Sequence, residues 1–243
     1  MPVYVLRPDD TVFSINRQAA LVGFSLRGEE VRLFDPDEFD DLSLTPADTV
    51  VGGVGFVRRA FERIGFDVPA LDSAPAPLAA FTGRRIWRAP IIEARRAVER
   101  GETLFVKPLP AQLKLFTGQP LRAFSDLLST AHLDDALIVE CAELTPFISE
   151  SRAFVLNGKI VDLRHYKGDP LVFPNAERLR AAVAAYQGAP AGYALDVGVA
   201  EDGRTLLVEV NDGYAVGAYG LPPIVYASLI AARWDQIRQA HSD

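Results

Sequence analysis

Three oxygen-bearing side chains near the end of the chain have the types and spacing of a metal site. Asp196 lies in one short β-rich run, and Glu209 and Asn211 lie in the next. Asp202-Gly203 stands between the two runs and is a strong signal for a tight hairpin turn. If these two residues form the loop, Asp196 and Glu209 face each other with their Cβ atoms about 5 Å apart. Asn211 then points to the same face of the hairpin.

Two facing carboxylates repel each other unless a cation lies between them. Carboxylate and amide oxygens suit a hard cation such as Mg²⁺. The alternative is a solvated acidic face on an edge hairpin that a lysine or an arginine stabilises, and the spacing alone leaves both open. The other face of the second strand is expected to enter the core through Leu206, Val208 and Val210. Glycines at 213, 217 and 220 indicate a sharply turning backbone after Asn211, which favours the metal site.

A second hairpin is predicted around Asn157-Gly158, another strong turn signal. In the register that this turn predicts, Arg152 faces Leu163 and lies one position from the partner of Arg164. The two guanidinium groups are therefore expected to converge near one end of the sheet. The planar fork of arginine suits the binding of a phosphate or a carboxylate.

Lys107 ends an apolar strand, and Pro108 keeps its backbone extended. An ammonium group at this place can meet a phosphate as a point charge. An ordinary lysine at the end of a strand is the alternative.

Two of these segments resemble motifs of the ATP-grasp superfamily. Val208-Glu-Val-Asn-Asp-Gly, preceded by Leu195-Asp-Val, resembles its C-terminal metal-binding hairpin, and Phe105-Val-Lys-Pro resembles its phosphate-binding strand. The resemblance spans about residues 81 to 221. It implies that Asp196, Glu209 and Asn211 hold the Mg²⁺ ions that bridge the phosphates of ATP, and that Lys107 contacts the α- and β-phosphates.

The resemblance implies further nucleotide contacts. Lys114 lies where the family carries a flexible, usually glycine-rich loop over the phosphates, although residues 108 to 117 contain no glycine here. Arg152 and Arg164 match two arginines, one of which lies near the γ-phosphate or the acyl phosphate. A hinge whose backbone binds the adenine edge is expected at Val139, Glu140, Cys141, Ala142 and Glu143. Glu143 is the first candidate for the ribose hydroxyls, and Glu150 is the second.

The order of elements predicts an α/β protein with three lobes. Strands alternate with helices up to about residue 70, which indicates a small parallel sheet, and a Pro- and Ala-rich segment from Ser73 then reads as a linker. The expected domains are an N-terminal lobe over 1–80, a small β-rich lid over 81–136 and a C-terminal antiparallel lobe over 137–243. The first helix, over 13–26, is expected to turn Ile15, Ala19, Val22 and Leu26 inward.

Composition excludes several classes of protein. The 243 residues carry a formal net charge of −7, which argues against sequence-independent binding of nucleic acid. The single cysteine, Cys141, allows no intramolecular disulfide and is expected to be a small apolar wall. No apolar run approaches the roughly 20 residues of a membrane span. With no signal peptide evident, no membrane partner is expected and the cytoplasm is the expected location.

The resemblance implies an enzyme that uses ATP and Mg²⁺ to activate a carboxylate as an acyl phosphate, which an amine or another nucleophile then attacks. The carboxylate could belong to an amino acid or a peptide. A kinase on the same scaffold and a non-catalytic nucleotide-binding module are the alternatives. The sequence leaves open a homodimer, and also whether His165 or the basic stretch from Arg84 to Arg100 takes part.

Overall fold

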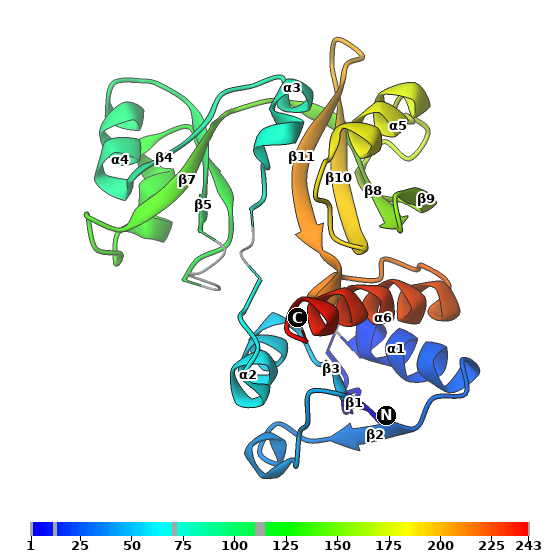
Figure 1. Ribbon diagram of the computed structural model, residues 1–243. Helices are drawn as coiled ribbons and strands as arrows, with labels where there is room; N and C mark the ends of the chain where they lie inside the picture. The colour runs from blue at the N-terminus through cyan, green and yellow to red at the C-terminus, as the bar shows by residue number, and fades with distance from the viewer. Residues whose placement is uncertain (1, 12–13, 70–71, 110–114, 243) are drawn as a thin grey trace.

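The computed structural model describes residues 2–11, 14–69, 72–109 and 115–242, and they form three sheets (Figure 1). The first sheet is parallel, with strand order β2-β1-β3. Its strands and flanking helices are β1 (Val3–Leu6), α1 (Ser14–Leu26), β2 (Val31–Phe34), β3 (Thr49–Val51) and α2 (Val54–Ile64). The small parallel sheet expected near the N-terminus is confirmed.

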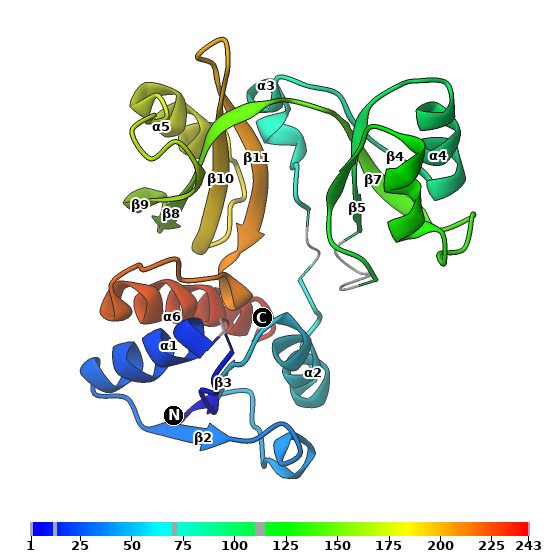
Figure 2. The ribbon, with the colours of Figure 1, turned by 180° about the vertical axis from the view of Figure 1, so that it is seen from behind.

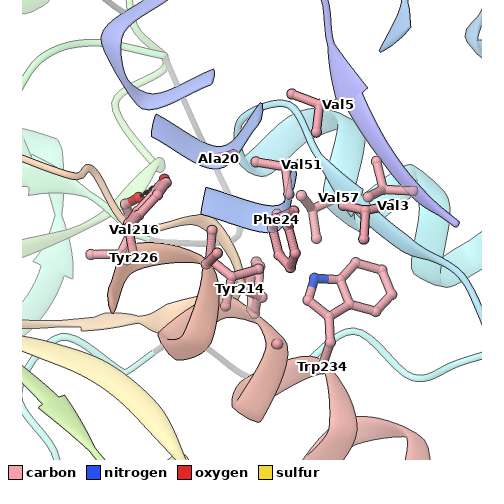
Figure 3. Packing of buried hydrophobic residues seen from close by; sticks show 14 of the residues in the cluster. Val3, Val5, Ala20, Phe24, Val51, Val57, Tyr214, Val216, Tyr226 and Trp234 are labelled. Carbon is pink, nitrogen blue, oxygen red and sulfur yellow. Dashed lines mark hydrogen bonds between the residues drawn. The ribbon is translucent and has the colours of Figure 1, made fainter. Parts of the chain in front are cut away.

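The core of this N-terminal part is completed by the other end of the chain. Helix α6 (Pro223–Ala240) lies against α1, as both ribbon views show (Figures 1 and 2). Trp234 of α6 and Tyr214 both pack on Phe61 of α2, with ring centroids 4.6 and 5.3 Å apart (Figure 3). The last helix therefore ties the first sheet to the C-terminal part of the chain.

Helix α1 turns a different face inward from the one expected. Ile15, Val22 and Leu26 are exposed, whereas Ala20 and Phe24 are buried. Gly23 explains the choice, because a Cβ at this position would lie 2.0 Å from the carbonyl oxygen of Pro223. Close approach of α1 to α6 thus needs the face with the smallest residue, and the larger apolar stripe is left outside.

The second and third sheets are antiparallel. The order β4-β7-β5-β6 is built from β4 (Ile86–Pro90), β5 (Leu104–Pro108), β6 (Gln119–Leu121) and β7 (Ile138–Glu143), with α4 (Ile91–Glu99) packed on it. The order β11-β10-β8-β9 is built from β8 (Phe147–Leu156), β9 (Lys159–Gly168), β10 (Gly192–Ala200) and β11 (Thr205–Asp212), with α5 (Ala176–Ala185) packed on it. The short helix α3 (Ala79–Thr82) lies between these two parts of the molecule (Figure 1).

The predicted α/β class with one parallel and two antiparallel sheets is confirmed. The division into 1–80, 81–136 and 137–243 remains a proposal, and the sheets favour a later second boundary. Strand β7 follows residue 136 but is a central strand of the small sheet, so the chain leaves that sheet only after Glu143. No helix in the described part of the chain is long and apolar enough to cross a membrane.

Two glycines within helices give opposite predictions. Gly23→Ala should lower the free energy of unfolding by about 1–3 kcal/mol, because the added methyl group forces α1 away from α6. Gly55→Ala in α2 should raise it by about 0.4–1 kcal/mol, because a Cβ there meets nothing within 4 Å and the unfolded chain loses entropy. Urea unfolding of both variants checks this. A neutral Gly23→Ala would contradict the close crossing of the helices.

Candidate active site

The hairpin of β10 and β11 brings Asp196 opposite Glu209, which confirms the expected facing. The path to this register differs from the expected one. Near the turn, Val197 pairs with Leu207, one position off the predicted register. Val208 is an extra residue in β11, and this β-bulge restores the alignment of Asp196 with Glu209.

The bulge also corrects the expected core face of β11. Leu206 pairs with Gly198, so it lies on the side of β10 that carries Asp196. Leu207 enters the core beneath α5 in its place, together with Val210. The predicted alternation was wrong because one extra residue reverses the side to which the preceding residues point.

The two facing carboxylates are each paired with a cationic side chain. Arg152 of β8 donates from Nε and Nη2 to the two oxygens of Asp196, both at 2.7 Å. Lys107 Nζ lies 2.9 Å from Glu209 Oε2 and 3.2 Å from Glu140 Oε1. The alternative to a metal site predicted such partners, but it predicted a solvated face, and Asp196 is only 3 % exposed.

Asn211 joins the two carboxylates. Its Nδ2 donates to Asp196 Oδ2 at 3.1 Å and to Glu209 Oε1 at 3.3 Å. Three oxygen-bearing side chains therefore converge at one point. No group of three or more His, Cys, Asp or Glu side chains suited to a metal occurs within the described residues, so two carboxylates and an amide are the donors that this site offers.

Burial and pairing act against each other on these groups. Burial favours a higher pKa for Glu209, but the Lys107 ammonium and its hydrogen bond outweigh this and hold the pKa below its usual range. Burial also favours a lower pKa for Lys107, yet Glu209 and Glu140 hold it above its ordinary value. For Asp196, burial raises the pKa although Arg152 opposes it. The carboxylates thus depend on their cations for charge balance.

The two predicted arginines lie directly opposite each other. Arg152 pairs with Arg164 and not with Leu163, because β9 also contains an extra residue, Val161. The guanidinium group of Arg164 binds Asp162 at 2.6 and 3.0 Å. The neighbouring backbone positions support the expected convergence, while the side chain of Arg164 is directed to a partner on its own strand.

The expected adenine hinge lies inside a sheet. Val139, Glu140, Cys141, Ala142 and Glu143 form the central strand β7, which pairs with β4 on one side and β5 on the other. Backbone groups in such a strand are used by the two ladders, so adenine binding by this stretch is not supported. Residues 144–146, between β7 and β8, lie outside both ladders.

The remaining candidates have different surroundings. Glu143 is exposed and accepts a hydrogen bond from the backbone N–H of Arg85. Glu150 is buried and binds the Tyr166 hydroxyl at 3.0 Å and the Lys167 ammonium. Burial raises the Cys141 pKa to about 11, as an apolar wall requires. His165 is exposed on the opposite side of β9 from Arg164, and Lys114 lies outside the described residues.

Two residues that the sequence did not single out complete the surroundings of the site. Ser73 Oγ donates to both oxygens of Glu140 at 2.9 and 3.0 Å, and the carbonyl of Ser73 accepts from Val210 N–H. Arg84 Nη1 lies 2.6 Å from the carbonyl oxygen of Leu207. These contacts join segments that are far apart in the chain, so no local sequence signal could have found them.

The segment that holds this site matches a known family profile. The profile is described as an ATP-grasp domain, the second family of its clade, and it covers residues 81–229, more than half of the chain. The chain therefore belongs to the ATP-grasp family. A search of curated proteins gave no match.

Solved structures show the same fold at low sequence identity. D-cycloserine synthetase DcsG has a TM-score of 0.64 at 13 % identity, over 98 % of this chain and all of the other. D-alanine–D-alanine ligase from Bacillus anthracis, solved with ATP, has 0.61 at 15 %, over 99 % of both chains. The ATP-grasp ligase PsnB, solved with a minimal precursor, has 0.57 at 17 %, over 95 % of this chain and 99 % of the other.

The lysine at the centre of this network should be needed for stability. Lys107→Met should lower the free energy of unfolding by about 3 kcal/mol, because it leaves Glu140 and Glu209 without their shared cation. Glu140→Gln added to Lys107→Met should recover part of the loss, and urea unfolding gives both values. Lys159→Met, at an exposed position, is the control. Additive effects in the double variant would contradict the pairing.

Proposed function

We propose that this protein is an ATP-dependent ligase that activates a carboxylate as an acyl phosphate for attack by an amine or another nucleophile. The observation that carries the proposal is the convergence of Asp196, Glu209 and Asn211 with two cations, Lys107 and Arg152, in a chain of the ATP-grasp family. The fold is shared with two ligases and a synthetase, which supports ligation over the alternatives.

Asp196, Glu209 and Asn211 would hold Mg²⁺ in this proposal. Their donor set fits, because carboxylate and amide oxygens suit this hard cation. The bound ion would neutralise charge on the phosphoryl group that is transferred.

The existing ion pairs supply the cations for the phosphates. Lys107 and Arg152 balance the charge of Glu209 and Asp196 in the absence of nucleotide. Once Mg²⁺ takes over the two carboxylates, the ammonium and guanidinium groups can turn to phosphate oxygens at little electrostatic cost. Arg164, one strand further, would then serve the acyl phosphate, and Lys114 would serve the phosphates from its own segment.

The nucleotide base has a revised place in the proposal. Residues 144–146 take the adenine contacts that we first expected within β7, since their backbone is outside the ladders. Glu143 and Glu150 remain the candidates for the ribose. An amino acid or a peptide is the proposed carboxylate, since D-alanine–D-alanine ligase and PsnB with its precursor peptide share the fold. An amine is the proposed acceptor.

Mg²⁺ dependence tests the metal site. Glu209→Gln should raise the Mg²⁺ concentration needed for half-maximal binding of a non-hydrolysable ATP analogue by about tenfold or more, because a charged ligand is lost. Calorimetry at a series of Mg²⁺ concentrations measures this. Glu201→Gln, an exposed position on the same hairpin, is the control. Equal Mg²⁺ dependence in both variants would reject Glu209 as a ligand.

Isotope transfer separates the ligase from a kinase and from a binding module. Purified protein is incubated with ATP, Mg²⁺ and pools of amino acids and peptides labelled with ¹⁸O in the carboxylate. An acyl phosphate carries one labelled oxygen into the released phosphate, and hydroxylamine intercepts it as a hydroxamate. Mass spectrometry of phosphate should find the label. Unlabelled phosphate from an active enzyme would reject acyl phosphate chemistry, and phosphate retained on a substrate would indicate a kinase.

A further inference from the structure

Strand β11, which carries Glu209 and Asn211, is an edge strand of its sheet. An edge strand presents backbone groups without ladder partners. Here the segment that leads into the small sheet meets these groups. The carbonyl of Ser73 accepts from Val210 N–H at 2.9 Å, and the guanidinium group of Arg84 donates to the carbonyls of Leu207 and Val208 at 2.6 and 3.0 Å.

The two carbonyls that Arg84 holds belong to the β-bulge. Val208 is the extra residue, and Leu207 is the last residue in the register that starts at the turn. If that register continued without the bulge, Glu209 would lie opposite Leu195, whose side chain is in the core. The bulge is therefore what brings Glu209 to the side of Asp196.

The surroundings of Arg84 fit a clamp on the backbone. Its third contact is also a carbonyl, that of Thr82 at 3.1 Å, and no ion pair of Arg84 occurs among the described residues. Burial lowers the pKa of Arg84, against the opposing charges of Glu140, Glu150 and Glu209. Bringing a guanidinium group into such a place only to meet carbonyls is unfavourable in itself, so holding the bulge is the function that its contacts indicate.

The residue before Arg84 supports the same contact. Gly83 has a φ of +60°, and a Cβ on it would lie 2.4 Å from Leu206 Cδ2. Glycine therefore allows the segment to lie flat on β11 beside the bulge.

We propose that Arg84 is a positioning residue of the metal site: by binding the carbonyls of Leu207 and Val208 it holds the β-bulge and so keeps Glu209 beside Asp196. The proposal deepens the proposed function, on which its consequence for Mg²⁺ rests. It also links the entrance of the small sheet to the metal hairpin, since a single residue separates Arg84 from β4.

The experiment compares Arg84→Met and Arg84→Lys with Arg88→Met, an exposed arginine of β4. The first readout is amide hydrogen exchange in β11 without nucleotide, which does not depend on the proposed function. Arg84→Met should speed exchange at residues 207–210 by about tenfold or more, because the bulge opens locally. Arg84→Lys should restore part of the protection, and Arg88→Met should match the unaltered protein.

The second readout is the binding of a non-hydrolysable ATP analogue with Mg²⁺ and with EDTA. Arg84→Met should weaken binding in Mg²⁺ by about tenfold and leave binding in EDTA unchanged, because only the metal ligands lose their alignment. Equal losses in both conditions, with unchanged exchange, would overturn the proposal and make Arg84 a direct ligand of the nucleotide.

A deletion of Val208 keeps the proposal testable if Arg84→Met does not fold. It removes the bulge with Arg84 intact, and it should abolish the Mg²⁺-dependent part of binding. Retained Mg²⁺ dependence would overturn the proposal. Faster exchange in Arg84→Met, with no nucleotide binding by the unaltered protein, would support the clamp and overturn the proposed function.

Discussion

The site depends on the balance of buried charges around Lys107. This single ammonium group meets Glu140 on the neighbouring strand of the small sheet and Glu209 on the edge of the C-terminal sheet. A buried carboxylate without a cation or hydrogen bonds is strongly unfavourable. The two sheets are thus joined at the point where the nucleotide is proposed to bind, and the same charges that a metal and phosphates would use hold the site together without them.

The scaffold brings these charges together through contacts at several edges. Ser73 binds Glu140 through its side chain and β11 through its backbone, and Arg84 binds β11 at the bulge. On the other side, α6 closes the core of the first sheet through Trp234, so the ends of the chain form one packed unit. The parts of the molecule are therefore connected by specific polar contacts near the site and by apolar packing away from it.

Sequence reasoning was most successful where the signal lay within a few residues. The Asp-Gly and Asn-Gly turns, the alternation in the strands and the family motifs predicted both hairpins and the facing of Asp196 and Glu209. It failed where a choice depended on distant neighbours. The inward face of α1 was decided by Pro223, and the place of β7 was decided by its pairing with both β4 and β5.

The sequence by itself determined the fold class, the two hairpins and the set of residue types that could bind a metal and phosphates, because turn chemistry and side-chain alternation act locally. The tertiary structure alone decided the bulge at Val208, the pairing of Lys107 with two glutamates and the contact of Arg84 with β11. These features arise between segments about 100 residues apart in the case of Lys107 and Glu209. Such contacts carry no local pattern, since their energy comes from burial and charge neutralisation that exist only after the sheets have met.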